Sequence, residues 1–381
     1  MNEIPPSSTN ILPSQHRSLK DRGVDLYKQV ESYTPAAFFL GGFVLDLATL
    51  GRIDDWSNWL MQVLYIVAAG GLLLWIFLDP EDPPPDSAGK VKKLIYEYRT
   101  EAMHFCFGAL LSVYTIFYFK SSSLIVSFFF ILLLTGLLLA NEFQKFKSQG
   151  YFLKFALFAL CIISFLIYFV PILLGHVGTL AFLLSFALSV AFFYWVFQFL
   201  KKRTPDSQLL MTQVFRPVAF VLILFLVLYL LRVLPPVPLS LKYVGVYHNI
   251  EKTPEGYKLQ YDRPFWKFWQ HGSQDFIADP GSKLYVFFQL FSPSAFSDQI
   301  YLEWYLKVPK QGWMLQDRIP IPVKGGRDEG YRGYGQKSNY TDGDWRVKVV
   351  TSDFREVGRI QFSVKKIASL PEARDWQYDI H

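Results

Sequence analysis

The residues best suited to recognition or chemistry in this chain are aromatic and lie together in one stretch. Residues 263–271, which we call the aromatic loop, hold five candidate contact residues: Phe265, Trp266, Lys267, Trp269 and His271. Aromatic side chains are enriched where proteins bind partners and where chains meet a membrane interface. Three interpretations are open: the rings fill a core, they rest on a membrane interface, or they bind a glycan or a protein partner.

A second candidate is a basic stretch, rich in glycine and tyrosine, further along the chain. Four of its side chains could contact an anionic group: Arg327, Tyr331, Arg332 and Lys337. A loop with cations and free backbone N–H groups can form an anion-binding concavity. The alternative is an exposed connection without a ligand, which is the ordinary role of such loops.

Patterns typical of catalysis or of a bound metal are missing from the sequence. We find no Ser/His/Asp or Cys/His arrangement, no phosphate-binding loop and no dinucleotide motif. His248, His271 and His381 are too scattered to predict zinc, and Asp342 and Asp344 offer too few oxygen ligands for calcium. The sequence therefore predicts no catalytic residue, no metal and no cofactor, and it favours a protein that is not an enzyme.

A third group of polar residues lies in or near stretches that are otherwise apolar. Its members are Asp46, Glu101, His104, Glu142 and Arg216. An ionisable group inside lipid is costly unless it is paired, so each is a candidate for a proton relay or a transport path. Because most lie near predicted helix ends, anchoring and hydrogen bonding between helices is the favoured interpretation. Glu101 and His104 are three residues apart and are predicted to share one helical face.

The elements that position these residues begin with a long apolar block. Hydrophobic residues make up 51% of the chain, and 36 residues are Phe. A membrane-spanning helix needs about 20 apolar residues. Seven stretches approach or reach that length: residues 33–50, 57–79, 100–119, 122–143, 152–174, 177–199 and 212–234. The sequence therefore predicts a transmembrane domain of seven helices over residues 33–234.

The connections between these stretches predict an orientation. The N-terminal segment, residues 1–32, and the loops after the second, fourth and sixth spans, together with Lys154 at the start of the fifth span, carry 14 Lys and Arg residues, whereas the alternate loops carry two. Positive residues concentrate on the cytoplasmic side, so we expect residues 1–32 in the cytoplasm and the C-terminal domain outside. The net charge of +6 reflects these loops and does not indicate a nucleic-acid partner.

Beyond Leu234 the apolar pattern changes from helical spacing to alternation. A proline-rich linker, residues 235–239, leads into a domain over residues 240–366, and a polar tail with one helical turn is expected over residues 367–381. Seven strands are predicted: residues 241–248, 257–261, 284–291, 299–306, 319–323, 345–351 and 358–364. Short strands without helical stretches are typical of an immunoglobulin-like β-sandwich.

The last two strands also carry a family resemblance. Gly343-Asp-Trp-Arg-Val-Lys-Val349 and Gly358-Arg-Ile-Gln-Phe-Ser-Val364, preceded by the basic stretch, resemble the bacterial domain of unknown function 2914. The resemblance implies an exposed C-terminal domain on a multi-span membrane protein of the bacterial envelope, and it implies no activity. Phe354 departs from the pattern, because a turn-forming Gly is expected after the preceding Asp.

Together these observations predict a bacterial inner-membrane protein that displays a β-sandwich in the periplasm. It would bind a protein or another envelope component, as a scaffold or subunit of an envelope complex, with the lipid bilayer and a protein partner or second copy as its contacts. The alternative is a transporter or membrane enzyme for a lipid-linked or small substrate, with the sandwich as an accessory. Since the linker is short, the aromatic loop is predicted either at headgroup depth, with Lys267 beside lipid phosphate, or against a neighbouring subunit.

Overall fold

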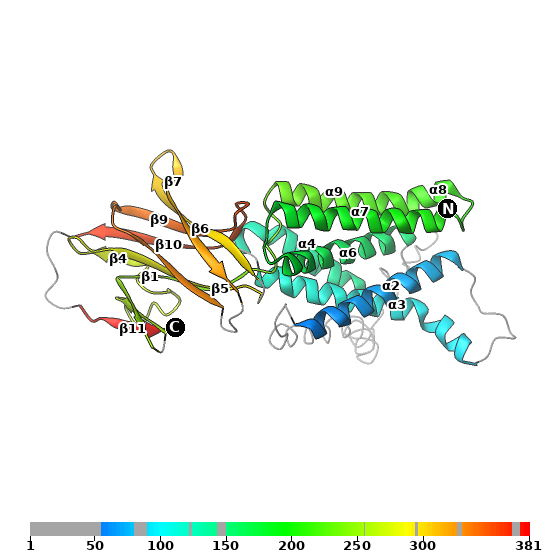
Figure 1. Ribbon diagram of the computed structural model, residues 1–381, viewed down its shortest axis with the longest axis horizontal. Coiled ribbons are helices and arrows are strands. Elements are labelled where there is room, and N and C mark those ends of the chain that lie inside the picture. The colour runs from blue at the N-terminus through cyan, green and yellow to red at the C-terminus, as the bar shows by residue number, and fades with distance from the viewer. Residues whose placement is uncertain are drawn as a thin grey trace, which may run out of the picture. The chain divides into compact units, whose positions relative to one another are not determined.

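A computed structural model of the chain describes residues 55–79, 90–121, 124–142, 150–254, 256–293, 296–325, 330–367 and 374–381 (Figure 1). Residues 1–32 and the first predicted span, with Asp46, lie outside the described residues, and so does Arg327. Within the described part, the helices and the strands belong to one compact unit, Gly51–His381.

The first half of the described chain is helical (Figure 1). Its helices are α2 (Trp56–Leu78), α3 (Lys90–Lys120), α4 (Leu124–Glu142), α6 (Tyr151–Leu174), α7 (Thr179–Lys201), α8 (Ser207–Leu210) and α9 (Arg216–Leu230), with a π-helical segment, Met211–Phe215, before α9. Helix α6 is the most enclosed, because 78% of its apolar window is buried, whereas α7 has 33% buried. The apolar side chains that α7 leaves exposed would face lipid if these helices cross a membrane.

Five helical stretches in the described part are long and apolar enough to cross a membrane: Trp56–Leu78, Tyr96–Lys120, Tyr151–Leu174, Thr179–Lys201 and Ser207–Leu230. They coincide with the second, third, fifth, sixth and seventh predicted spans. The fourth predicted span falls on α4, in which the stretch Ser127–Leu137 is apolar. The presence of several membrane-type helices is confirmed, while the total of seven stays a prediction.

The second half forms a two-layer β-sandwich, as the alternating pattern predicts. One sheet has the order β1 (Ser240–Tyr247), β5 (Leu284–Phe291), β8 (Tyr331–Lys337). The facing sheet has the order β4 (Asp275–Ala278), β10 (Glu356–Lys366), β9 (Gly343–Val350), β6 (Ser297–Val308), β7 (Gly312–Lys324). Side chains from both sheets, among them Phe288, Trp304 and Trp345, fill one hydrophobic core between them. A small third sheet has the order β11 (Gln377–Ile380), β3 (Gly256–Tyr261), β2 (Asn249–Thr253).

Four strands escape the sequence prediction: β2, β4, β8 and β11. Strand β8 contains Gly333 and Gly335, whose missing side chains remove the alternating signal. These glycines have a packing reason, because a Cβ at Gly333 would lie 2.8 Å from the Phe288 ring and one at Gly335 would lie 2.7 Å from Leu302. Strand β11 lies in the predicted polar tail, where Gln377–Ile380 pair antiparallel with β3. The helical turn expected near residues 371–376 stays a prediction, because residues 368–373 lie outside the described residues.

Side chains join the sandwich to the helices. Val177, between α6 and α7, is 2% exposed and belongs to the sandwich core. The Asp298 carboxylate of β6 accepts a hydrogen bond from the Val177 N–H at 3.2 Å. In the turn after β9, Asp353 accepts a hydrogen bond at 2.8 Å from the Tyr229 hydroxyl of α9. Burial opposes the charged form of Asp353, but the Arg355 guanidinium and hydrogen bonds hold the pKa of this carboxyl below its ordinary value.

Candidate functional site

The aromatic loop connects β3 to β4, and four of its rings lie outside the core. The exposed fractions are 91% for Phe265, 53% for Trp266, 79% for Phe268 and 60% for Trp269. Apolar rings of this size are normally buried, and four neighbouring exposed ones form a patch that calls for an explanation. The interpretation that these rings fill the sandwich core is therefore wrong.

Hydrogen bonds within the protein hold this loop in one shape. The Lys267 N–H donates to the Pro264 carbonyl, and the Gln270 N–H donates to the Lys267 carbonyl, each at 3.0 Å. The Arg263 guanidinium donates to the Gln270 carbonyl, which ties the two ends of the loop together. The Gln377 amide of the C-terminal segment donates to the Arg263 carbonyl at 2.9 Å. The loop is thus a set of consecutive turns fastened at its base.

Three of the four rings, those of Trp266, Phe268 and Trp269, contact one another. Trp266 and Trp269 have ring centroids 6.2 Å apart with planes at 59°, and Phe268 meets Trp269 at 5.3 Å and 80°. Edge-to-face contacts are favourable and fix the relative orientation of neighbouring rings. The result is a small apolar cluster in which several ring faces remain open to a partner.

Lys267 is engaged inside the protein. Its Nζ lies 2.5 Å from an Asp275 carboxylate oxygen and 5.0 Å from the centre of the Trp266 ring. The hydrogen bond from Lys267 outweighs partial burial and holds the pKa of Asp275 below its ordinary value. The predicted contact of Lys267 with lipid phosphate would require a free ammonium group, and the structure instead pairs this group with a carboxylate.

His271 is also exposed, but its ring contacts the sandwich and anchors the loop. Its Nδ1 lies 3.1 Å from the Val244 carbonyl of β1, and its ring stacks on Tyr243 with centroids 4.8 Å apart. The next residue, Gly272, forms a β-bridge with Val246. The predicted contact residues therefore divide into exposed rings and an anchor that fastens them to the sandwich.

The described part of the basic stretch is a strand. Tyr331, Arg332 and Lys337 all lie in β8, where Tyr331 packs against the core. Lys337 is 5% exposed, and its Nζ donates to Asp317 and, at 3.0 Å, to Asn339. Burial lowers the pKa of Lys337. Its hydrogen bonds and burial leave Lys337 unsuited to binding an anion, while an anion-binding role for Tyr331 and Arg332 stays a prediction.

The described polar residues predicted near the spans differ in their burial. On α3, which holds both residues three positions apart, His104 is 2% exposed while Glu101 is exposed. Arg216 is exposed at the first position of α9. Glu142 ends α4, where only the backbone is described. Within the described part of the chain, no three His, Cys, Asp or Glu side chains are grouped so that they could hold a metal ion.

Buried polar contacts between helices are the feature that sequence reasoning missed here. The Tyr168 hydroxyl of α6 donates to the Gln62 amide oxygen of α2 at 2.8 Å, and both side chains are buried. Arg99 is 5% exposed, donates to the Asp79 carbonyl at 3.1 Å and lies 4.2 Å from the centre of the Tyr96 ring. The only sequence signal is a polar residue within an apolar run, which does not reveal the partner. These contacts fasten helices to one another.

The described chain thus combines membrane-type helices with a C-terminal β-sandwich. Residues 297–364, which include β6 to β9 and most of β10, match the family model described as Protein of unknown function (DUF2914). The match confirms the resemblance carried by the C-terminal strands. None of the curated proteins compared with the chain matches it.

Solved structures give only distant likenesses. An immunoglobulin-like protein from Pseudomonas aeruginosa is 14% identical over 32% of this chain and 97% of its own, with a TM-score of 0.19. A beta-glucosidase from Listeria innocua is 15% identical over 24% of this chain and 15% of its own, with a TM-score of 0.18. The DNA glycosylase AlkC from Pseudomonas fluorescens is 10% identical over 80% of this chain and 99% of its own, with a TM-score of 0.21. The sandwich is therefore defined by its strand pairing and its core, and not by these likenesses.

Proposed function

We propose that this protein is a bacterial inner-membrane protein whose immunoglobulin-like sandwich binds a protein partner in the periplasm through the aromatic loop. The observation that carries the proposal is the exposure of four neighbouring rings on a loop fastened by hydrogen bonds. Exposed aromatic side chains are typical anchors of protein interfaces. A loop that already has one shape loses little freedom on binding, which favours affinity.

Two observations favour a protein partner over the membrane surface. First, Lys267 is paired with Asp275, so the loop offers apolar rings without a free positive charge. Second, the loop lies far from the helices. Asp275, at the start of β4, pairs with Ser363 of β10. Ser363 is seven residues from Glu356, the first residue of β10, which lies close to the turn that contacts α9. Strands rise about 3.3 Å per residue, so Asp275 lies about 23 Å along β10 from that end. The interfacial layer of a bilayer is only about 5–8 Å thick on each side.

The transporter alternative has less support. The described polar residues that would form a path differ in burial: His104 is buried, whereas Glu101 and Arg216 are exposed. A charged group in a transport path is expected to face the bundle interior or a water-filled cavity and to find a partner there. A binding role for the sandwich therefore remains the proposal.

The orientation is tested by reporter fusions after Lys147 and after His381. Three membrane-type stretches, Tyr151–Leu174, Thr179–Lys201 and Ser207–Leu230, separate these points. An odd number of crossings places the two reporters on opposite sides, and the positive residues place Lys147 inside. We expect a cytoplasm-dependent fluorescent reporter to be active only at Lys147 and a periplasm-dependent phosphatase only at His381. The same side for both reporters would refute the topology.

The binding role is tested by replacing Trp266 and Trp269 together by Ala. Both side chains are more than half exposed, so the thermal midpoint is expected to change by less than about 2 °C. Removing two anchor rings is expected to reduce the partner recovered after cross-linking in cells by at least about tenfold.

A matched double variant, Met314→Ala with Leu315→Ala, removes apolar side chains that are 42% and 45% exposed on β7. It should leave recovery unchanged. Unchanged recovery for the tryptophan variant would move the binding surface elsewhere, and recovery of a glycan instead of a protein would support stacking on sugar. Unfolding of the tryptophan variant would show that the rings are structural after all.

A further inference from the structure

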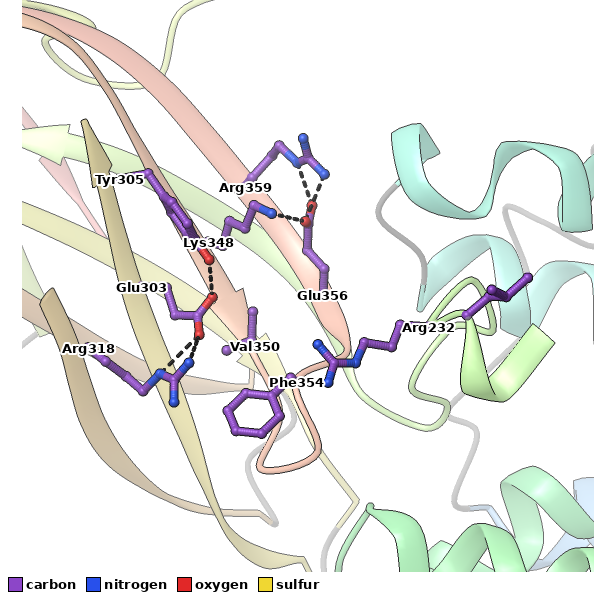
Figure 2. Close-up of a pocket in the computed structure, with 10 residues that line it drawn as sticks. Arg232, Glu303, Tyr305, Arg318, Lys348, Val350, Phe354, Glu356 and Arg359 are labelled. Atoms are coloured by element: carbon purple, nitrogen blue, oxygen red, sulfur yellow. Dashed lines mark hydrogen bonds and ion pairs between the residues drawn. The ribbon is translucent and has the colours of Figure 1, made fainter. Parts of the chain in front are cut away.

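A charged cavity of about 450 Å³ lies where the end of α9 meets the sandwich (Figure 2). Strands β6, β7, β9 and β10 supply most of its wall, and the turn between β9 and β10 and the residues that follow α9 supply the remainder. Its size is that of sites for small ligands. Six of its side chains are charged: Arg232, Arg318, Lys348 and Arg359, with Glu303 and Glu356.

Both carboxylates of the cavity are shared between several donors. Glu303 accepts hydrogen bonds from the Arg318 guanidinium at 2.6 and 3.0 Å and from the Tyr305 hydroxyl at 2.7 Å. Glu356 accepts from the Arg359 guanidinium at 2.5 and 2.7 Å and lies 3.4 Å from the Lys348 ammonium (Figure 2). Two carboxylates face four cations, so the wall carries an excess of positive charge.

Two of these cations lie against the Phe354 ring. The Arg318 guanidinium carbon lies 4.6 Å from the ring centre, and that of Arg232 lies 5.3 Å from it. Figure 2 shows Arg232 reaching from the helix end towards Phe354. Two like charges held against one small ring repel each other unless an anion lies near both.

Both residues that close this side of the cavity have a strained backbone. Phe354 has φ 63° and Arg232 has φ 57°, values that favour glycine. Phe354 occupies a turn position where Gly is expected, and Gly would adopt this backbone conformation without strain. Strain of this kind persists at binding sites, where it holds a side chain in place.

We infer that this cavity binds the phosphate of an anionic phospholipid headgroup. Guanidinium groups donate paired hydrogen bonds to phosphate oxygens. A bound phosphate would also compensate the positive charge that the two carboxylates leave in excess. Leu231, Val350 and Phe354 give the cavity an apolar border next to the last turn of an apolar helix. Apart from Leu231 and Arg232, every lining residue lies within the family match, residues 297–364. The site is separate from the aromatic loop, so failure of either proposal leaves the other standing.

The test uses the full chain purified in a neutral detergent. Short-chain phosphatidylglycerol, phosphatidylcholine with the same chains, and inorganic phosphate are titrated separately while the thermal midpoint is followed at constant ionic strength. We expect phosphatidylglycerol to raise the midpoint saturably and phosphatidylcholine to have no such effect. Arg232→Gln is expected to weaken phosphatidylglycerol binding by about tenfold to a hundredfold, since it removes a charge-assisted contact.

Two further variants separate binding from folding. Phe354→Gly suits the left-handed backbone, so it should keep or raise the midpoint without ligand while weakening phosphatidylglycerol binding. Arg203→Gln is the matched control, because Arg203 lies 4.4 Å from the Phe199 ring near the end of α7, away from this cavity. It should bind phosphatidylglycerol as the unchanged chain does.

Each outcome decides between readings of the site. Saturable binding of phosphatidylglycerol alone, sensitive to Arg232→Gln, supports the lipid headgroup. If inorganic phosphate also binds saturably and Arg232→Gln weakens that binding equally, the cavity is an oxyanion site that takes its ligand from solution. An absence of saturable binding, or an equal loss with Arg203→Gln, overturns the inference.

Discussion

Replacing Trp304 by Ala is expected to lower the free energy of unfolding of the sandwich by about 3–5 kcal/mol, the usual result of removing a large core aromatic. Trp304 lies in β6, is 0% exposed and belongs to the main core. It stands opposite Val347 in β9 and meets the Phe362 ring edge-on at 6.4 Å. The truncation leaves a cavity that these strands cannot close without losing their pairing. Thermal unfolding of the full chain, followed by the β-sheet circular dichroism signal, measures the change.

Trp313 provides the matched control for this prediction. It lies in β7, is half-buried, and its ring packs against the Arg346 guanidinium at 3.9 Å. Trp313→Ala is expected to cost less than about 1.5 kcal/mol, because its ring is partly in water already. Equal losses for the two variants would contradict the placement of Trp304 at the centre of the core.

The sequence predicted the parts of the fold that depend on regular spacing. The β9–β10 hairpin is an example: Trp345, Val347 and Val349 alternate with charged residues, and the structure buries all three. Apolar runs likewise located five membrane-type stretches. The pattern fails in β8, where Gly333 leaves room for Phe288 of the neighbouring strand and thus carries no apolar signal of its own.

The candidate sites were less accessible to sequence reasoning, for two physical reasons. A run of Phe and Trp residues reads the same in a sequence whether the rings are buried or exposed. Only the structure shows that the rings of the aromatic loop are exposed. The cavity at the end of α9 assembles residues that are distant in the chain, from Arg232 to Arg359. Its single sequence signal was Phe354, at a turn position where Gly is expected.

Replacing Gly272 by Ala is expected to detach the aromatic loop from the sandwich. Gly272 has φ +67°, and a Cβ built on it would lie 2.0 Å from the Val246 carbonyl oxygen. The backbone must move away from β1, which breaks the bridge to Val246 and the 2.8 Å hydrogen bond from the Ser273 N–H to that carbonyl. Strain of about 1–2 kcal/mol and two weakened hydrogen bonds of about 1 kcal/mol each predict a total loss of about 3–4 kcal/mol.

Gly281→Ala is the control that measures backbone strain without a steric clash. Gly281 has a similar φ of +75°, but nothing lies within 4 Å of its built Cβ, so only about 1–2 kcal/mol should be lost. Hydrogen exchange of residues 262–275 should speed up in the Gly272 variant and stay unchanged in the Gly281 variant, because only the first breaks contacts with β1. If the rings must be held in place to bind, partner recovery should fall with Gly272→Ala even though Trp266 and Trp269 remain. Equal stability losses and equal exchange in the two variants would show that the contact with Val246 does not hold the loop.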